Sequence, residues 1–201
     1  MKRKAPNSPP SAPAARGDAV RAAFEDALRR LAGQTPFEKL TVRGISRAAG
    51  HSTRTFYNRW KSKYDLVIRY YAEEDLAAIR AALAGGPLPT YGDMLRRAIR
   101  RFRRDRRMFL GAFRDMIGPE SFAATFLEHA CRSTPVYIRM RTGRDMPVGL
   151  APVLRHYYGG MLLVIAEWLA SPAPLPPDRI LRDLLAALPT PLRSLLLTAE
   201  P

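Results

Sequence analysis

Two short helical patterns joined by a tight glycine turn constrain the fold of this chain most strongly. Thr41 is a suitable N-cap for the first helix, and Gly50 ends it. The inward residues of this helix are Val42, Ile45, Ala48 and Ala49. Helices that meet at such a turn cross at a steep angle, so the second helix projects from the surface.

The second helix has a buried face and a polar face. Ser52 or Thr53 caps it, and Phe56 and Trp60 share one side at i, i+4. Its outward side chains are donors and acceptors suited to base edges and phosphates: Ser52, Thr53, Arg54, Thr55, Asn58 and Arg59. These residues predict a helix that enters the major groove of DNA.

The rest of the chain also has helical periodicity. A helix is expected over about 18–33, before the glycine turn, and a longer one follows the N-cap Ser62 and ends at Gly85-Gly86-Pro87. Further helices are expected at about 90–115, 119–132, 147–170 and 177–197. The fold class is therefore all-α, with a small N-terminal three-helix unit followed by a larger helical bundle.

The charge of the chain indicates an anionic partner. Lys and Arg number 33 against 18 Asp and Glu, which gives a net charge of +15, and residues 1–65 hold 14 of the basic and 5 of the acidic side chains.

The single cysteine, Cys131, permits no intrachain disulfide and suits the cytoplasm. Neither a signal peptide nor a membrane span is expected, because prolines follow the basic start and the most apolar run, 161–166, is short.

Residues 1–15 are rich in Pro, Ser and Ala and are expected to form a disordered basic arm. Two uses of this arm remain open. It is either a solubilising tail, or Lys2, Arg3 and Lys4 contact DNA phosphates or a minor groove.

The N-terminal unit resembles the tetracycline-repressor (TetR) family over about residues 16–70. The residues that carry the resemblance are the run 41–50 (TVRGISRAAG), then Ser52, Thr55-Phe56-Tyr57, Trp60 and the run 62–66 (SKYDL). The resemblance implies a DNA-binding transcriptional regulator, by default a repressor, with a helix-turn-helix domain at 16–62 and a dimerisation and effector-binding domain at 63–201.

The resemblance also implies roles for single residues. Tyr57, Lys63 and Thr41 would contact phosphate, while Thr53, Arg54 and Thr55 would face the groove. The complete set of DNA contacts expected from residues and resemblance is Thr41, Arg43, Ser52, Thr53, Arg54, Thr55, Tyr57, Asn58 and Lys63. Two positions depart from the family pattern: His51 replaces a small aliphatic residue in the turn, and Trp60 replaces the usual closing aromatic.

The C-terminal bundle is expected to carry a dimer interface and a ligand pocket. Members of the family dimerise through their last two helices, and the helix at 157–169 is too apolar to lie half exposed. The interface residues expected are Tyr157, Met161, Val164, Trp168, Leu181, Leu184, Leu185 and Leu188. The alternative for some of them is a place in the core of a single chain. The expected pocket residues, which are aromatic or soft, are Phe102, Phe109, Phe113, Met116, Phe122, Phe126, His129, Tyr137 and His156.

Partners expected are a double-stranded DNA operator, a second copy of the chain and a small effector. Neither a metal nor another cofactor is expected, because the chain has three His and one Cys. An arginine run at 96–107 is interpreted as a solvated helix face, with an acidic effector, DNA flanks and an anionic membrane as the alternatives. An enzymatic function is not supported, because the sequence contains no phosphate loop or nucleophile motif. The remaining alternative to a DNA-binding regulator is a helical adaptor that contacts proteins or lipids.

Overall fold

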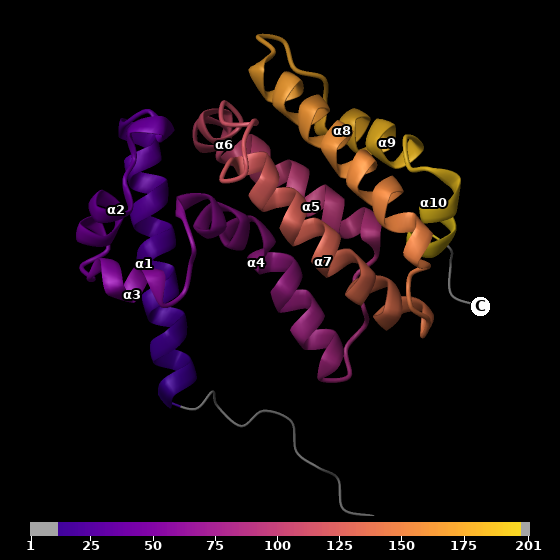
Figure 1. The fold of residues 1–201 in the computed structure, drawn as a ribbon, viewed down its shortest axis with the longest axis horizontal. Coiled ribbons are helices and arrows are strands. Elements are labelled where there is room, and N and C mark those ends of the chain that lie inside the picture. The colour runs from indigo at the N-terminus through magenta and orange to yellow at the C-terminus, as the bar shows by residue number, and fades with distance from the viewer. Residues whose placement is uncertain (1–11, 198–201) are drawn as a thin grey trace, which may run out of the picture.

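A computed structural model describes residues 12–197, and all of their regular structure is helical. Figure 1 shows three N-terminal helices beside a larger bundle. The helices are α1 (Ala12–Gln34), α2 (Val42–Ala48), α3 (Thr53–Tyr57), α4 (Lys63–Leu83), α5 (Tyr91–Arg104), α6 (Arg106–Ala112), α7 (Phe122–Thr142), α8 (Ala151–Ala170), α9 (Pro177–Ala186) and α10 (Thr190–Leu196), with 3-10 turns at Phe37–Lys39 and Val148–Leu150. The expected all-α class is confirmed.

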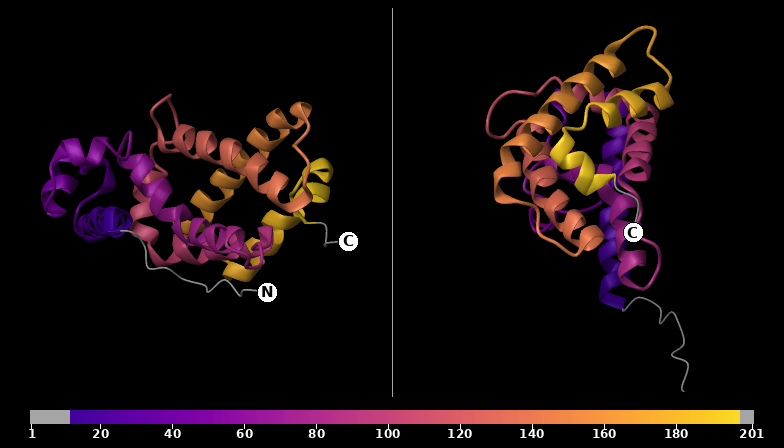
Figure 2. Two further views of the ribbon diagram at one scale, coloured as in Figure 1. Left: turned by 90° about the horizontal axis from the view of Figure 1, so that it is seen from below. Right: turned by 90° about the vertical axis from the view of Figure 1, so that its right-hand side faces the viewer.

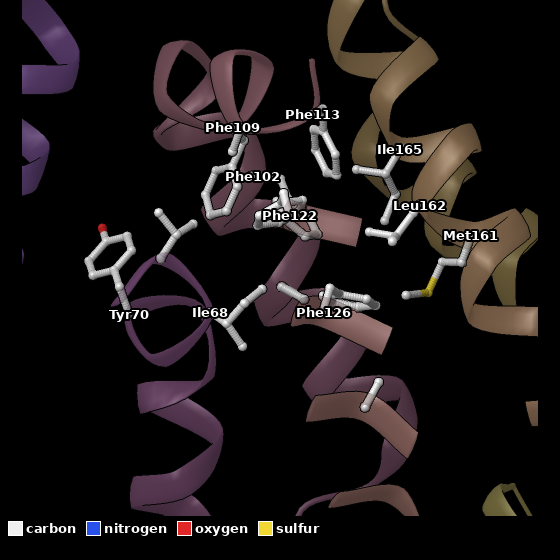
Figure 3. Packing of buried hydrophobic residues seen from close by; sticks show 14 of the residues in the cluster. Ile68, Tyr70, Phe102, Phe109, Phe113, Phe122, Phe126, Met161, Leu162 and Ile165 are labelled. Atoms are coloured by element: carbon white, nitrogen blue, oxygen red, sulfur yellow. The ribbon is translucent and has the colours of Figure 1, made fainter. Parts of the chain in front are cut away.

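The three N-terminal helices lie at one end of an elongated molecule, and α8, α9 and α10 lie at the other. The view from below in Figure 2 shows this separation, with α4 leading from one part into the other. The bundle has an aromatic centre, in which the rings of Phe102 and Phe109 meet edge to face at 4.6 Å. Phe113 and Phe122 meet in the same way at 5.1 Å. Figure 3 shows these rings converging between α4 and α8.

Some helix limits differ from those expected from sequence. Helix α1 begins at Ala12, so residues 12–15 of the expected arm are helical, while residues 1–11 lie outside the described part. The helix expected at 90–115 is divided at Asp105, whose carboxylate accepts a hydrogen bond from the Tyr70 hydroxyl at 2.6 Å. A single helix at 177–197 is likewise divided, because Pro189 lacks the amide that would continue it.

Helix α7 continues through Pro135, although an end near residue 132 was expected. A proline inside a helix removes one hydrogen bond and costs about 3 kcal/mol. Here Phe126 and Ala130 before the proline, and Tyr137 and Ile138 after it, are all buried. Burial of this apolar face outweighs the cost of the proline.

The segment Val148–Ala170 is long and apolar enough to cross a membrane by length and composition alone. In the structure, however, its side chains Leu154, Leu162 and Ile165 are fully buried. Helix α8 packs on α6 and α7. Its apolar character is therefore explained in part by a place in the protein core.

The N-terminal helices are joined tightly to the bundle. Gly111 of α6 lies so close to the turn Phe37–Lys39 that a Cβ there would clash with the Cβ of Phe37. Beside this contact, Arg107 donates a hydrogen bond to the carbonyl of Gly33 at 3.0 Å, and Arg114 pairs with Glu38 at 3.0 Å. The orientation of the N-terminal unit on the bundle is thus set by close packing as well as by charged hydrogen bonds.

Candidate nucleic-acid interface

The turn between α2 and α3 is built from local hydrogen bonds that the sequence predicts. The Thr41 hydroxyl accepts a hydrogen bond from the amide of Gly44 and caps α2. Gly50 then adopts a φ of +73°, which a residue without a Cβ tolerates at little cost. The amide of His51 reaches back to the carbonyl of Ser46 at 3.0 Å, as in a Schellman-type helix end.

Helix α3 has only five residues, and its position depends on an aromatic cluster beneath it. Ser52 caps it by accepting a hydrogen bond from the amide of Thr55. Phe56 and Trp60 are buried, and their ring centroids lie 5.6 and 5.0 Å from that of Phe24 in α1. A helix this short is unstable alone, so this cluster holds it in place.

His51 has a packing role. Its ring stacks on Phe24 with centroids 5.5 Å apart and planes inclined by 21°. The imidazole therefore covers the cluster from the turn side, at the position where the family pattern has a small aliphatic residue. In this position His51 is half-buried.

The opposite face of α3 presents the predicted DNA-contact residues to solvent. Ser52, Thr53, Arg54 and Asn58 are exposed, and the Tyr57 side chain is 60 % exposed despite its large ring. Thr55 is half-buried and its hydroxyl shares a hydrogen bond of 3.0 Å with Ser52. Arg43 on α2 and Thr41 at its start are exposed as well. Eight of the nine predicted positions thus lie on the two helices and their caps.

Lys63 is the ninth position, and its geometry corrects the expected role. Its ammonium donates hydrogen bonds to three carbonyls of the turn before α2: Phe37 at 3.0 Å, Glu38 at 3.3 Å and Leu40 at 3.1 Å. Burial lowers the pKa of this ammonium, although nearby Asp115 and Glu38 oppose the change. The cation closes a loop within the protein instead of pointing to a phosphate.

A cavity of about 130 Å³ lies between α4, α5, α7 and α8. Three of the expected pocket residues line it, namely Phe126, His129 and Tyr137. Phe102, Phe109, Phe113 and Phe122 belong instead to the aromatic core, Met116 lies partly buried against that core, and His156 is exposed on α8. These six do not line this cavity, because aromatic character alone does not distinguish a core residue from a lining residue.

The sequence reading missed lining residues from α4 and α5. Tyr71 and Asp75 lie one turn apart on α4, while Tyr91 and Met94 come from α5. No segment of the sequence brings these positions together. Their only signal was spacing on their own helices, and the packing of four helices makes them neighbours.

Burial changes the pKa values of the titratable groups that line the cavity. Asp75 accepts two contacts from Arg97, at 2.8 and 2.7 Å, yet burial still raises the pKa of its carboxyl. Burial lowers the pKa of His129, and the neighbouring cations Arg69 and Arg132 add to that effect. His129 is therefore neutral at pH 7.

The expected dimer contacts require a larger correction. Tyr157, Met161, Trp168, Leu181, Leu184 and Leu188 are buried inside one chain, where the Tyr157 hydroxyl donates to the carbonyl of Leu184 at 3.0 Å. Leu185 is half-buried, and Val164 is 42 % exposed. Exposed Leu163 and Gly160 accompany Val164 on the same face of α8. The apolar surface that a partner could cover is narrower than the sequence suggested.

The arginine run is also less exposed than expected. Arg101 is buried, and its guanidinium pairs with Glu74 and donates to the carbonyls of Tyr70 and Tyr71. Arg106 donates to the carbonyl of Leu169 at 2.6 Å. Much of the run therefore binds the protein itself. Within residues 12–197, no cluster of His, Cys, Asp or Glu is arranged to hold a metal ion.

Comparison with known proteins agrees with this geometry. Residues 26–70 match the family described as "Bacterial regulatory proteins, tetR family". Thermus thermophilus FadR, described as a TetR family transcriptional repressor in complex with lauroyl-CoA, has a similar structure at 22% identity, with a TM-score of 0.50 over 90% of this chain and 97% of that one. The dihydroxyacetone kinase operon activator DhaS gives 13% identity and a TM-score of 0.49, over 84% and 96% of the two chains. No curated protein matches the chain significantly.

Proposed function

We propose, since the N-terminal domain of this chain belongs to the tetR family of bacterial regulatory proteins, that this transcriptional regulator is a ligand-responsive repressor that binds a palindromic operator as a homodimer. The observation that carries the proposal is the two-sided construction of α3. Its apolar face is locked by Phe24, Phe56 and Trp60, while Arg54 and Asn58 are presented to solvent. Such a helix reads base edges in the major groove.

The homodimer follows from the geometry of operators. Two recognition helices must lie about 34–36 Å apart to reach successive major grooves on one side of a duplex. Gly160, Leu163 and Val164 form an exposed apolar face on α8, which lies on the far side of the molecule from α3 (Figure 1), and this face supports a pairing of two chains. We place such a dimer in the cytoplasm, where its DNA partner lies.

Ligand response is supported by the path from the cavity to α1. Tyr71 and Asp75 line the cavity on α4, and Arg101 holds the α4 backbone at Tyr70 and Tyr71. The Tyr70 hydroxyl donates to Asp105, which pairs with Arg29 of α1 at 3.6 Å. A ligand that shifts α4 would thereby change the position of the N-terminal unit and with it the spacing of two recognition helices.

The experiment is a selection of bound fragments from randomised duplexes at two salt concentrations, with the wild type and Tyr57→Phe. A palindromic motif that is weakened by salt and by removal of the Tyr57 hydroxyl supports the proposal. Salt-sensitive binding without an enriched motif would contradict it, because generic affinity for polyanions explains that result. The adaptor alternative is then favoured.

A further inference from the structure

The size of the cavity limits what it can bind. Its volume is about 130 Å³. An engineered apolar cavity of about 150 Å³ in another protein binds benzene. The cavity as it stands therefore has room for about one six-membered ring, and an acyl chain of twelve carbons exceeds this volume and would extend through the open side.

The walls of the cavity suit an aromatic ring. Rings from four tyrosines and one phenylalanine line it: Tyr71, Tyr91, Phe126, Tyr137 and Tyr158. Tyr91, Tyr158 and Met161 are buried, whereas Leu76 and Ile79 are half-buried and Ser133 is exposed. The open side thus lies between α4 and α7, and the aromatic floor lies toward α5 and α8. Offset or edge-to-face contacts with such walls favour another ring.

Most polar groups at the cavity already have partners within the protein. The Tyr137 hydroxyl donates to the carbonyl of Pro89 at 2.8 Å. The hydroxyls of Tyr158 and Thr134 share a hydrogen bond of 2.8 Å. These groups position the walls and leave little hydrogen-bonding capacity for a ligand.

Two polar groups on α4 have free hydrogen-bonding capacity toward the cavity. Both contacts from Arg97 end on the Oδ1 atom of Asp75, and no donor to Oδ2 is found within residues 12–197. The hydroxyl of Tyr71, one turn earlier, likewise has no hydrogen-bond partner in the described part of the chain. The Asp75 side chain is 18% exposed. A ligand that supplies an N–H or O–H to its Oδ2 atom in the cavity gains a hydrogen bond to a carboxylate that is mostly shielded from water.

The charge of the lining selects against anions. Asp75 is the only carboxylate among the lining residues, and His129 is neutral at pH 7 because its pKa is lowered by burial. Arg97 approaches the far oxygen of Asp75 and does not itself line the cavity. A ligand carboxylate or phosphate placed against the Oδ2 atom of Asp75 would therefore meet a like charge.

We infer that the effector is a small aromatic molecule that carries a hydrogen-bond donor, a phenol or an aromatic amine, with its ring between the tyrosines and its donor on Oδ2 of Asp75. This inference rests on the proposed function, because it specifies the ligand to which the regulator responds. Ring size provides affinity, and the donor provides selectivity over plain hydrocarbons.

The test measures binding to the full chain by calorimetry and by the shift in Tm. The probes are phenol, aniline, toluene, benzoate and lauroyl-CoA. Phenol and aniline should bind about tenfold or more tightly than toluene, because a hydrogen bond to a charged group is lost in toluene. Benzoate and lauroyl-CoA should give no saturable signal.

Two variants assign the effect to α4. Asp75→Asn keeps the shape of the side chain and should reduce the preference for phenol over toluene about tenfold, with toluene affinity retained. Tyr71→Phe, which leaves the Asp75–Arg97 pair intact, provides a second reading should Asp75→Asn unfold, and it should lower phenol affinity several-fold. Asp178→Asn, an exposed position on α9, is the matched control and should bind as the wild type.

Several outcomes would overturn the inference. Toluene binding as tightly as phenol removes the role of the donor, and benzoate binding as tightly as phenol removes the role of Asp75. Saturable binding of lauroyl-CoA, or no binding of any ring compound, removes the size argument. Operator binding is followed separately by fluorescence anisotropy. Ring binding without operator binding would overturn the proposed function alone, and operator binding without ring binding would overturn this inference alone.

Discussion

Arg54 is the exposed side chain of α3 with the best geometry for a guanine, because a guanidinium can bond O6 and N7 together. Arg54→Ala should relax the preference at one base pair of each half-site, at a cost of about 1–3 kcal/mol for the preferred operator. A randomised-operator selection measures this directly. Arg182→Ala, an exposed arginine on α9, is the control, and an unchanged preference in Arg54→Ala would refute the assignment.

Lys63 distinguishes a residue that supports the fold from one that touches DNA. Because its ammonium donates to three carbonyls, Lys63→Met should lower the free energy of unfolding by about 1.5–3 kcal/mol. The slope of log K against log salt for operator binding should stay unchanged, since no phosphate contact is lost. Lys61→Met, at an exposed neighbour, should leave stability unchanged. A shallower salt slope for Lys63→Met would restore the phosphate role.

His129 makes the stability of the protein depend on pH. Its pKa in the folded state lies below the usual value of about 6.5, so the unfolded chain binds the proton more readily. The stability due to neutral His129 is therefore complete above about pH 6.5 and falls as the pH drops below it. Urea unfolding at pH 7.5 and 5.5 should show a smaller loss in His129→Gln than in the wild type, by less than about 1.4 kcal/mol per pH unit. Glu25 and Asp75, whose pKa values are raised by burial, act in the opposite direction in both proteins. Equal losses in the two proteins would exclude this role.

At the scale of elements, the contact of α6 with the turn Phe37–Lys39 fixes how the N-terminal unit sits. Gly111→Ala places a Cβ against Phe37 and should destabilise the protein by about 1–3 kcal/mol, as overpacking does. Operator affinity should fall as well, because the clash separates α6 from the N-terminal unit. Gly33→Ala is the control, since nothing lies within 4 Å of its new Cβ and alanine favours a helix. Unfolding curves measure the stability of each variant. Equal stabilities of Gly111→Ala and the wild type would contradict the close packing of α6 on the turn.

Local features of the elements could be predicted from sequence, whereas those that depend on packing could not. The N-caps Thr41, Ser52 and Ser62 can be predicted from a few neighbouring residues, and the structure confirms all three. At the division between α5 and α6, Asp105 accepts a hydrogen bond from Tyr70, which is distant along the chain, and helical periodicity does not predict such a contact. Continuation of α7 through Pro135 depends on burial of both its halves. The candidate site shows the same contrast: the exposure of the α3 residues follows from local periodicity, whereas only three of the expected residues line the cavity.

At the scale of the whole molecule, the exposed face of α8 should decide the oligomeric state. Val164→Arg places a charge among Gly160 and Leu163 and should give a monomer in sedimentation at micromolar concentration. Operator affinity should drop roughly a hundredfold, because two linked half-site contacts are replaced by one. Val136→Arg, at an exposed valine on α7, is the control. A dimeric Val164→Arg protein would place the interface elsewhere.

The buried face and the exposed face of α3 are formed by different side chains. Phe56 is buried in the aromatic cluster, whereas Thr53, Arg54 and Asn58 are exposed to solvent. Exchanges on the outer face therefore leave the folded unit intact, as ordinary surface substitutions do. If the proposed function holds, the chain is in this sense retargetable: a few exchanges of polar residues on α3 would give new operators and leave the effector cavity unchanged.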